Sequence, residues 1–111
     1  MQDMPEDVQD EFGRALLDAQ YGEHPEEARP FGEGVSRRVM KLIANHRGDT
    51  FRAAYTAEFD RCVYLLHVFK KKSKSGKGTP RAHLATIEAR YKAAREHYAR
   101  TYRMTEEPAD D

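Results

Sequence analysis

Residues 62–69, with the sequence CVYLLHVF, decide the fold, because nearly all eight are apolar, β-branched or aromatic. A run of this length and composition between turn residues predicts a β-strand. Since polar residues do not alternate with apolar ones, we expect a central strand that is buried on both faces. The next residues, KKKSKSGKG at 70–78, contain five lysines. They predict a basic loop, because they offer no apolar side chains to a core.

Two further strands are predicted before this run. Residues 50–56, TFRAAYT, are a strand candidate that two alanines weaken, and EFDR at 58–61 supplies the turn that follows. Residues 35–45, VSRRVMKLIAN, fit either a helix or a strand. We prefer a strand from about Val39, because a turn, NHRGD at 45–49, and a further strand come next. Short turns join antiparallel neighbours, so the sequence predicts three antiparallel strands.

An N-terminal helix is predicted over residues 4–21. Asp3 can cap its first turn together with Glu6, and Pro5 is tolerated there because first-turn amides have no partner. Apolar side chains recur at a spacing of three and four residues and therefore lie on one stripe of the helix. The stripe consists of Val8, Phe12, Ala15, Leu16 and Ala19. Residues 23–34 contain two prolines and two glycines and predict a connecting loop.

A long C-terminal helix is expected to have Thr79 as its cap and Pro80 as its first residue. Its buried stripe should consist of Leu84, Ile87, Tyr91, Ala94 and Tyr98. The prediction is therefore an α+β fold, a small antiparallel sheet with both helices covering one face. Residues 1–104 would form a single domain, and 105–111 an acidic tail that is expected to be disordered.

The 111 residues suffice for one domain, and 34% of them are charged. The net charge of zero conceals a segregation: residues 1–33 hold ten acidic against two basic residues, whereas 34–104 hold seventeen basic against five acidic ones. A region this basic in a short chain is a plausible footprint for a polyanion, although a charged domain with no nucleic-acid role has the same composition.

Several classes of protein are not expected. A single cysteine, Cys62, excludes an internal disulfide framework and a cysteine-based zinc cluster. No histidine pair has metal-ligand spacing, and no phosphate-cradling glycine motif is present, so we expect neither a metal nor another cofactor. No apolar run reaches the roughly 20 residues that span a bilayer, and the acidic start does not resemble a signal peptide. We therefore expect a cytoplasmic location.

Arg52 is the first candidate for a functional residue. Because side chains alternate along a strand, Arg52 and Ala54 should face away from Phe51, Ala53 and Tyr55. If the aromatic side meets the helices, Arg52 lies on the open face, where a guanidinium could bind a phosphate with two parallel hydrogen bonds. The alternative is a cross-strand ion pair on a solvated face.

The lysines that follow the third strand and a histidine within it are the other candidates. The lysines suit tracking of a nucleic-acid backbone, or they merely solubilise a loop. His67 could take part in catalysis, but a buried, hydrogen-bonded structural histidine fits its position at least as well. The lysines concerned are Lys70, Lys71, Lys72, Lys74 and Lys77.

Three stretches, GDTFRAAYT, VYLLHVFKKKSKSGKGTP and ATIEARYKAAREHY, together resemble phage-related toxins of the HigB branch of the RelE/ParE superfamily. MPEDVQDEFGRALLDAQYG is similar to the first helix of that group, so the resemblance covers about residues 5–102. It implies a type II toxin that binds the ribosomal A site and cleaves translated mRNA, and a partner antitoxin with a helix-turn-helix domain. Relatives often begin with an additional strand and offer a C-terminal tyrosine as base, and this chain matches neither feature.

The resemblance also implies roles for individual residues. Arg52 matches the sheet arginine of an R-x-x-Y pattern associated with the scissile phosphate, His67 matches a histidine before the basic run, and Lys70 to Lys72 match that run. We therefore expect catalysis from Arg52, His67, Lys71 and Lys72, and contacts to RNA or the ribosome from Lys70, Lys74, Lys77 and Arg81. Two alternatives remain, namely a ParE-like toxin that inhibits gyrase and a non-catalytic module that binds RNA or protein.

Overall fold

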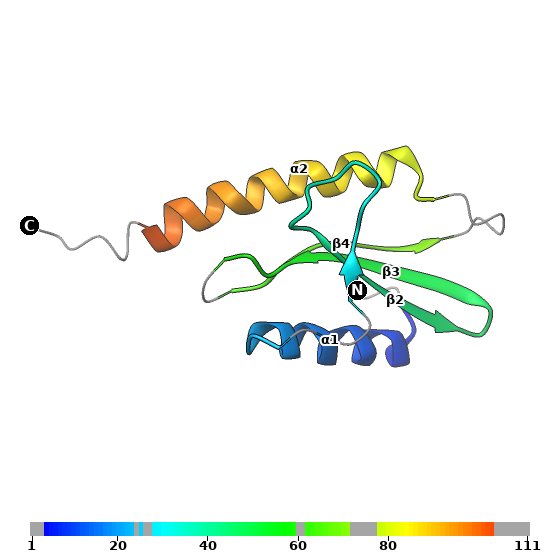
Figure 1. Cartoon of the computed structure of the whole chain (residues 1–111). Coiled ribbons are helices and arrows are strands. Elements are labelled where there is room, and N and C mark those ends of the chain that lie inside the picture. The colour runs from blue at the N-terminus through cyan, green and yellow to red at the C-terminus, as the bar shows by residue number, and fades with distance from the viewer. Residues whose placement is uncertain (1–3, 24, 26–27, 60–61, 72–77, 104–111) are drawn as a thin grey trace, which may run out of the picture.

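Two helices enclose a four-stranded antiparallel sheet, which confirms the predicted α+β class (Figure 1). The computed structural model describes residues 4–23, 25, 28–59, 62–71 and 78–103. The acidic tail expected at 105–111 lies outside these residues. In chain order the elements are α1 (Glu6–Gln20), β1 (Arg29–Pro30), β2 (Met40–His46), β3 (Asp49–Thr56), β4 (Tyr64–Lys71), α2 (Arg81–Tyr98) and a π-helical turn, η1 (Ala99–Arg103).

The strands follow one another across the sheet in the order β1-β2-β3-β4. The prediction of β4 as a central strand is wrong, because in the described sheet it pairs with β3 alone and Leu65 is 40% exposed. Its apolar composition has another cause: Val68 packs against the core under α1, while Leu66 and Phe69 pack in the core under α2. The short strand β1 was not expected, since it falls in the stretch predicted as a loop.

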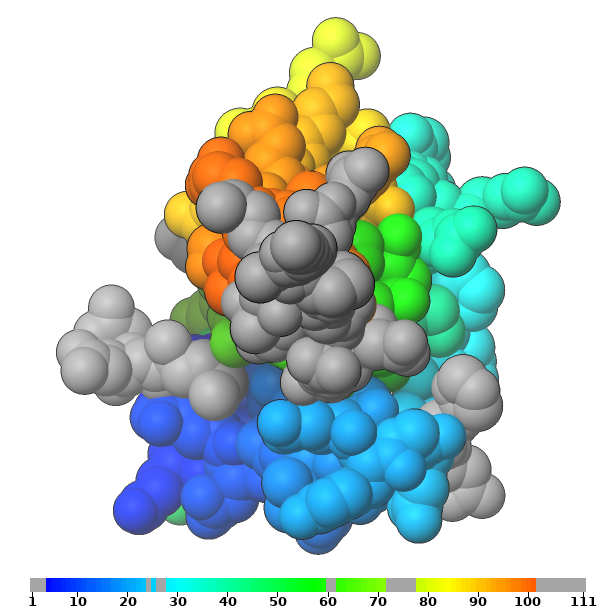
Figure 2. Space-filling view, turned by 90° about the vertical axis from the view of Figure 1, so that its left-hand side faces the viewer, coloured from blue at the N-terminus to red at the C-terminus, as the bar shows by residue number. Residues whose placement is uncertain are grey.

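The two helices lie on opposite faces of the sheet, not on one face as predicted (Figure 1). We call these the α1 face and the α2 face. Ala53 belongs to the α1 core and Ala54 to the α2 core, and both are fully buried. The two alanines that weakened the strand prediction thus lie at adjacent positions on opposite faces of β3, each buried in one of the two cores. Figure 2 shows the layering from the side, with α1 and α2 at opposite ends of the molecule.

The helical stripes are close to those predicted. In α1, Val8, Phe12, Ala15 and Ala19 are buried and Leu16 packs against the core; in α2, Ile87, Tyr91 and Ala94 are buried, with Leu84 and Tyr98 half-buried.

The predicted caps are wrong where the structure describes them, because Pro5 and Pro80 occupy the N-cap positions without side-chain capping bonds. Thr79 bonds to Glu33 instead, and Asp3 lies outside the described residues. No helix among the described residues is long and apolar enough to cross a membrane.

Candidate phosphate-binding site

Arg52 lies in the middle of β3, opposite Ile43 of β2 and Phe69 of β4. It shares its side of the strand with Ala54, so it lies on the α2 face. The expectation of a helix-free face is therefore wrong, since each face carries a helix. Arg52 is nevertheless half-exposed, and its Nε atom is buried without a hydrogen-bond partner among the described residues. A buried donor without a partner is uncommon and suggests a place for an acceptor that comes from outside.

Two lysines flank Arg52 on the same face. Lys41 of β2 lies opposite Ala54, and Lys71 of β4 lies opposite Thr50. Each is therefore a diagonal cross-strand neighbour of Arg52, a relation that places Cα atoms roughly 7–8 Å apart. We call Lys41, Arg52 and Lys71 the cationic group; it forms a diagonal across three strands. The predicted association of Arg52 with the lysine run thus holds for Lys71.

Lys41 was missed by the sequence analysis. Its Nζ lies 5.3 Å from the centroid of the buried Phe31 ring. Burial lowers the pKa of Lys41, and the charges of Arg52 and Lys71 lower it further, against the opposing effect of Glu33. The sequence MKLIAN did contain a sign of it. Lys41 lies two residues before Ile43 in a largely apolar strand, so the two side chains lie on the same face.

Glu33 supplies the nearby negative charge, and it was also not expected. Its carboxylate accepts hydrogen bonds from the Thr79 backbone N–H (2.7 Å) and from Thr79 Oγ1 (2.9 Å). Burial acts to raise the pKa of Glu33, but these bonds and the charges of Lys41 and Arg52 outweigh it, so the pKa lies below its usual value. The ionised carboxylate therefore ties the loop before β2 to the start of α2, beside the cationic group.

His67 lies opposite Ala54 on the α2 face, under α2. Its Nε2 is 2.9 Å from Nδ1 of His83, and its Nδ1 is 3.3 Å from an Nη1 of Arg90 that also donates to the Leu66 carbonyl. Burial lowers the pKa of His67, and His83 and Arg90 lower it further. Both ring nitrogens are thus engaged, which matches the structural alternative considered above, and His67 stays a prediction as a catalytic residue.

Among the other predicted basic residues, the structure describes Lys70 and Arg81. Lys70 lies opposite Phe51 on the α1 face and forms an ion pair with Asp49 at 3.5 Å. Lys72, Lys74 and Lys77 lie outside the described residues. Arg81 is the first residue of α2 and is exposed.

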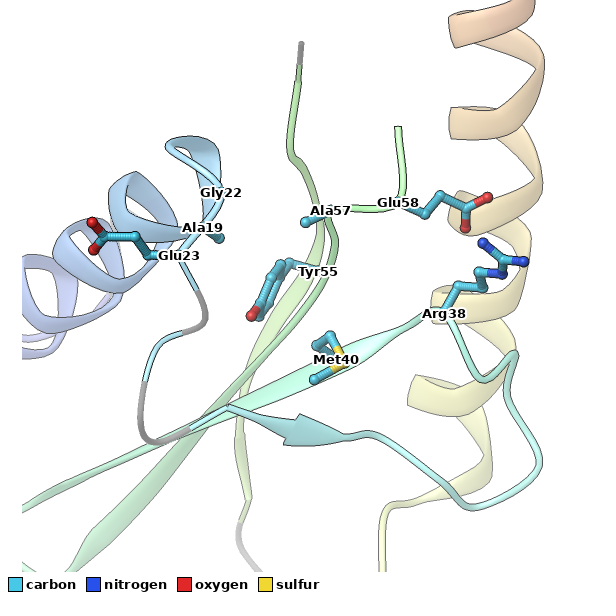
Figure 3. A pocket seen from close by; sticks show the side chains of 8 residues that line it. All are labelled: Ala19, Gly22, Glu23, Arg38, Met40, Tyr55, Ala57 and Glu58. Atoms are coloured by element: carbon cyan, nitrogen blue, oxygen red, sulfur yellow. The ribbon is translucent and has the colours of Figure 1, made fainter. Parts of the chain in front are cut away.

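A mainly apolar hollow of about 300 Å³ lies away from the cationic group, at the C-terminal end of α1. Figure 3 shows Tyr55 and Met40 within it, with Arg38 and Glu58 on the side nearer α2. Tyr55 belongs to the α1 core, so this hollow is on the other side of the sheet from Arg52. Among the described residues, no group of three metal-binding side chains occurs.

Comparison with known proteins adds a family to this geometry. A family model described as "Phage derived protein Gp49-like (DUF891)" matches residues 1–92. The chain belongs to this Gp49-like family. The family is associated with RelE-like toxins of toxin–antitoxin systems. No curated protein and no solved structure matched the chain. The matched part of this Gp49-like protein contains the whole cationic group as well as Glu33 and His83.

Proposed function

We propose that this Gp49-like protein is the toxin of a type II toxin–antitoxin pair and that it acts in the cytoplasm as a ribosome-dependent endoribonuclease on translated mRNA. The observation that carries the proposal is the cationic group: three basic side chains on one face of the sheet, with a buried Arg52 Nε that lacks a partner. The toxin association of the family supports it. A helix-turn-helix antitoxin would neutralise the protein.

The reaction needs no external reactant. The 2′-oxygen of a ribose attacks the adjacent phosphorus and the bond from phosphorus to the 5′-oxygen breaks, which leaves a 2′,3′-cyclic phosphate and a 5′-hydroxyl. One proton leaves the 2′-hydroxyl and one reaches the leaving oxygen. Negative charge develops on the phosphoryl oxygens, where fixed cations stabilise it. Arg52 and Lys71 would provide these cations.

Lys41 is the candidate for the base that takes the 2′-hydroxyl proton. A lysine can accept a proton only as the neutral amine, and its surroundings raise the neutral fraction by lowering its pKa. A site of this kind gains from a ribosome that holds the mRNA in an attack geometry, since orientation supplies a large part of a barrier reduction.

Inducible expression in bacteria tests the proposal. We expect the parent chain to arrest growth and to create new mRNA 5′ ends within translated regions. Arg52→Ala should reduce the frequency of these ends by about a hundredfold or more, as loss of a group that stabilises transition-state charge does. Arg37→Ala, at an exposed position before β2, is the matched control and should leave cleavage unchanged.

Other outcomes would contradict specific parts of the proposal. Equal toxicity of Arg52→Ala and the parent would remove Arg52 from the mechanism. Growth arrest with a DNA-damage response and intact transcripts would indicate a gyrase inhibitor of the ParE type. Normal growth together with salt-sensitive RNA binding would indicate a non-catalytic module.

A further inference from the structure

Two contacts hold the ring of His83 over Phe69, the cross-strand partner of Arg52. His83 is in the first turn of α2, where its backbone N–H donates to the Pro80 carbonyl. Its ring stacks on Phe69 with centroids 4.2 Å apart and planes inclined by 15°. Phe69 is the cross-strand partner of Arg52, so His83 lies over the strand pair that carries Arg52. The bond between Glu33 and Thr79 fixes the start of α2 at the same place.

The hydrogen-bond chain determines where the proton of His83 resides. An arginine can only donate, so His67 Nδ1, which faces Arg90, must be the acceptor. His67 is neutral near pH 7, because its pKa is lowered, and its proton is therefore on Nε2. That N–H donates to His83 Nδ1 at 2.9 Å. Because His83 Nδ1 accepts this bond, the ring N–H of His83 is on its own Nε2.

The Nε2–H of His83 has no hydrogen-bond partner among the described residues, and neither does the buried Nε of Arg52. Phe69 connects the two donors, because His83 stacks on its ring and Arg52 is its cross-strand partner. Lys41 and Lys71 flank Arg52 on the same face. An oxyanion with several acceptor oxygens satisfies such donors, and a phosphodiester is the oxyanion that the basic face attracts. In this tautomer His83 offers no lone pair at Nε2, so it is a donor and not a base.

We propose that His83 is a phosphate-binding residue of this site, which donates Nε2–H to a phosphoryl oxygen of the RNA while Arg52 binds the same phosphate. His67 and Arg90 are positioning residues that set the tautomer of His83. The identity of the ligand as RNA rests on the proposed function. The assignment of the His83 proton to Nε2 rests on the hydrogen-bond chain from Arg90 through His67.

The first test is NMR of the ¹⁵N-labelled histidine rings near pH 7. Both His67 and His83 should be Nε2–H tautomers. Titration with inorganic phosphate, and then with a 2′-O-methyl RNA oligonucleotide that cannot be cleaved, should shift the His83 Nε2 signal more than any signal of His67. His67→Phe should raise the Nδ1–H fraction of His83, an effect that a purely structural role would not produce. An Nδ1–H tautomer of His83 in the parent would overturn the proposal.

The second test compares affinities for the same oligonucleotide. His83→Phe keeps a ring that can stack on Phe69 but lacks the donor, and it should weaken binding about five- to tenfold, the usual effect of one lost hydrogen bond. His83→Gln retains a donor and should stay within about threefold of the parent. His97→Gln, on the same helix far from Arg52, is the control and should bind like the parent. Parent-like binding by His83→Phe would overturn the proposal.

Neither test depends on cleavage. If the chain cuts no RNA in cells but the Nε2–H tautomer and the loss of binding in His83→Phe are found, the endoribonuclease proposal fails and the assignment of His83 stands. If cleavage is found and His83→Phe binds like the parent, the endoribonuclease proposal stands and the assignment of His83 fails.

Discussion

The α1 face and the α2 face of the sheet are built from alternate residues of the same strands, yet they differ in kind. On the α1 face, the core around Phe12 and Tyr55 consists of apolar and aromatic side chains. On the α2 face, an apolar core around Ile87 adjoins the cationic group and the pair formed by His67 and His83. One residue step along β3, from Phe51 to Arg52, leads from the first environment to the second.

This difference teaches how a small domain can hold charges close together. Like charges on one face repel each other and lose hydration, which costs stability. An uninterrupted apolar core on the other face can offset that cost, because burial of apolar area is the main favourable contribution to folding. We therefore expect substitutions on the two faces to affect different measurements, function on the α2 face and stability on the α1 face.

The largest effect is expected from Lys41→Arg on the α2 face. The guanidinium keeps the positive charge but cannot be deprotonated in a protein, so it cannot serve as a base. Cleavage of mRNA in a cell-free translation reaction should fall by about 10²–10⁴, and the rise in rate with pH that deprotonation of Lys41 produces should disappear. Lys92→Arg, at an exposed position of α2, is the control. A parent-like rate for Lys41→Arg would show that Lys41 acts as a fixed charge and that another group is the base.

Phe12→Ala on the α1 face should have the opposite profile. Phe12 is 1% exposed in the core between α1 and the sheet. Truncation should lower the free energy of unfolding in urea by about 3–5 kcal/mol, because it leaves a cavity as well as removing apolar contacts. Leu17→Ala on the same helix, where the side chain is 50% exposed, should change it by less than about 0.5 kcal/mol. Loss of RNA affinity in folded Phe12→Ala would contradict the separation of the two faces.

The sequence predicts the elements well but not the side of the sheet on which each helix packs. The spacing of Val8, Phe12 and Ala15 specifies a buried stripe, and β3 and β4 are found within two residues of their predicted bounds. A stripe, however, does not say which face it meets. β3 is apolar at both Ala53 and Ala54, so its pattern allows a helix on either face.

The site is predictable only where its residues are close in sequence or share a recognisable run. Arg52 and Lys71 were found because an arginine in an apolar strand and a lysine run are conspicuous. Glu33 and His83 acquire their roles from contacts with residues far along the chain, Glu33 with Thr79 and His83 with His67. Neither residue has a local pattern that distinguishes it from a solvated side chain.

The smallest effect is expected from the pH dependence of stability on the α2 face. The native pKa of His67 lies below its usual value of about 6.5, so in the interval between the two the unfolded chain binds a proton that the native chain does not. The contribution of His67 to stability is therefore complete above about pH 6.5 and is lost as the pH falls through that interval. Urea unfolding at several pH values should show a shallower acid loss for His67→Gln than for the parent.

Equal slopes for the parent and His67→Gln would contradict this assignment. The direction of the effect follows from burial of the His67 ring and from the charges of His83 and Arg90, which all disfavour the protonated form. Protonation also places hydrogens on both ring nitrogens. His67 could then no longer accept from Arg90 and would still donate to His83. Acid would thus remove one link between α2 and β4 without affecting the α1 core. The loss of stability on the α2 face would therefore be accompanied by a change at the phosphate site and not at Phe12.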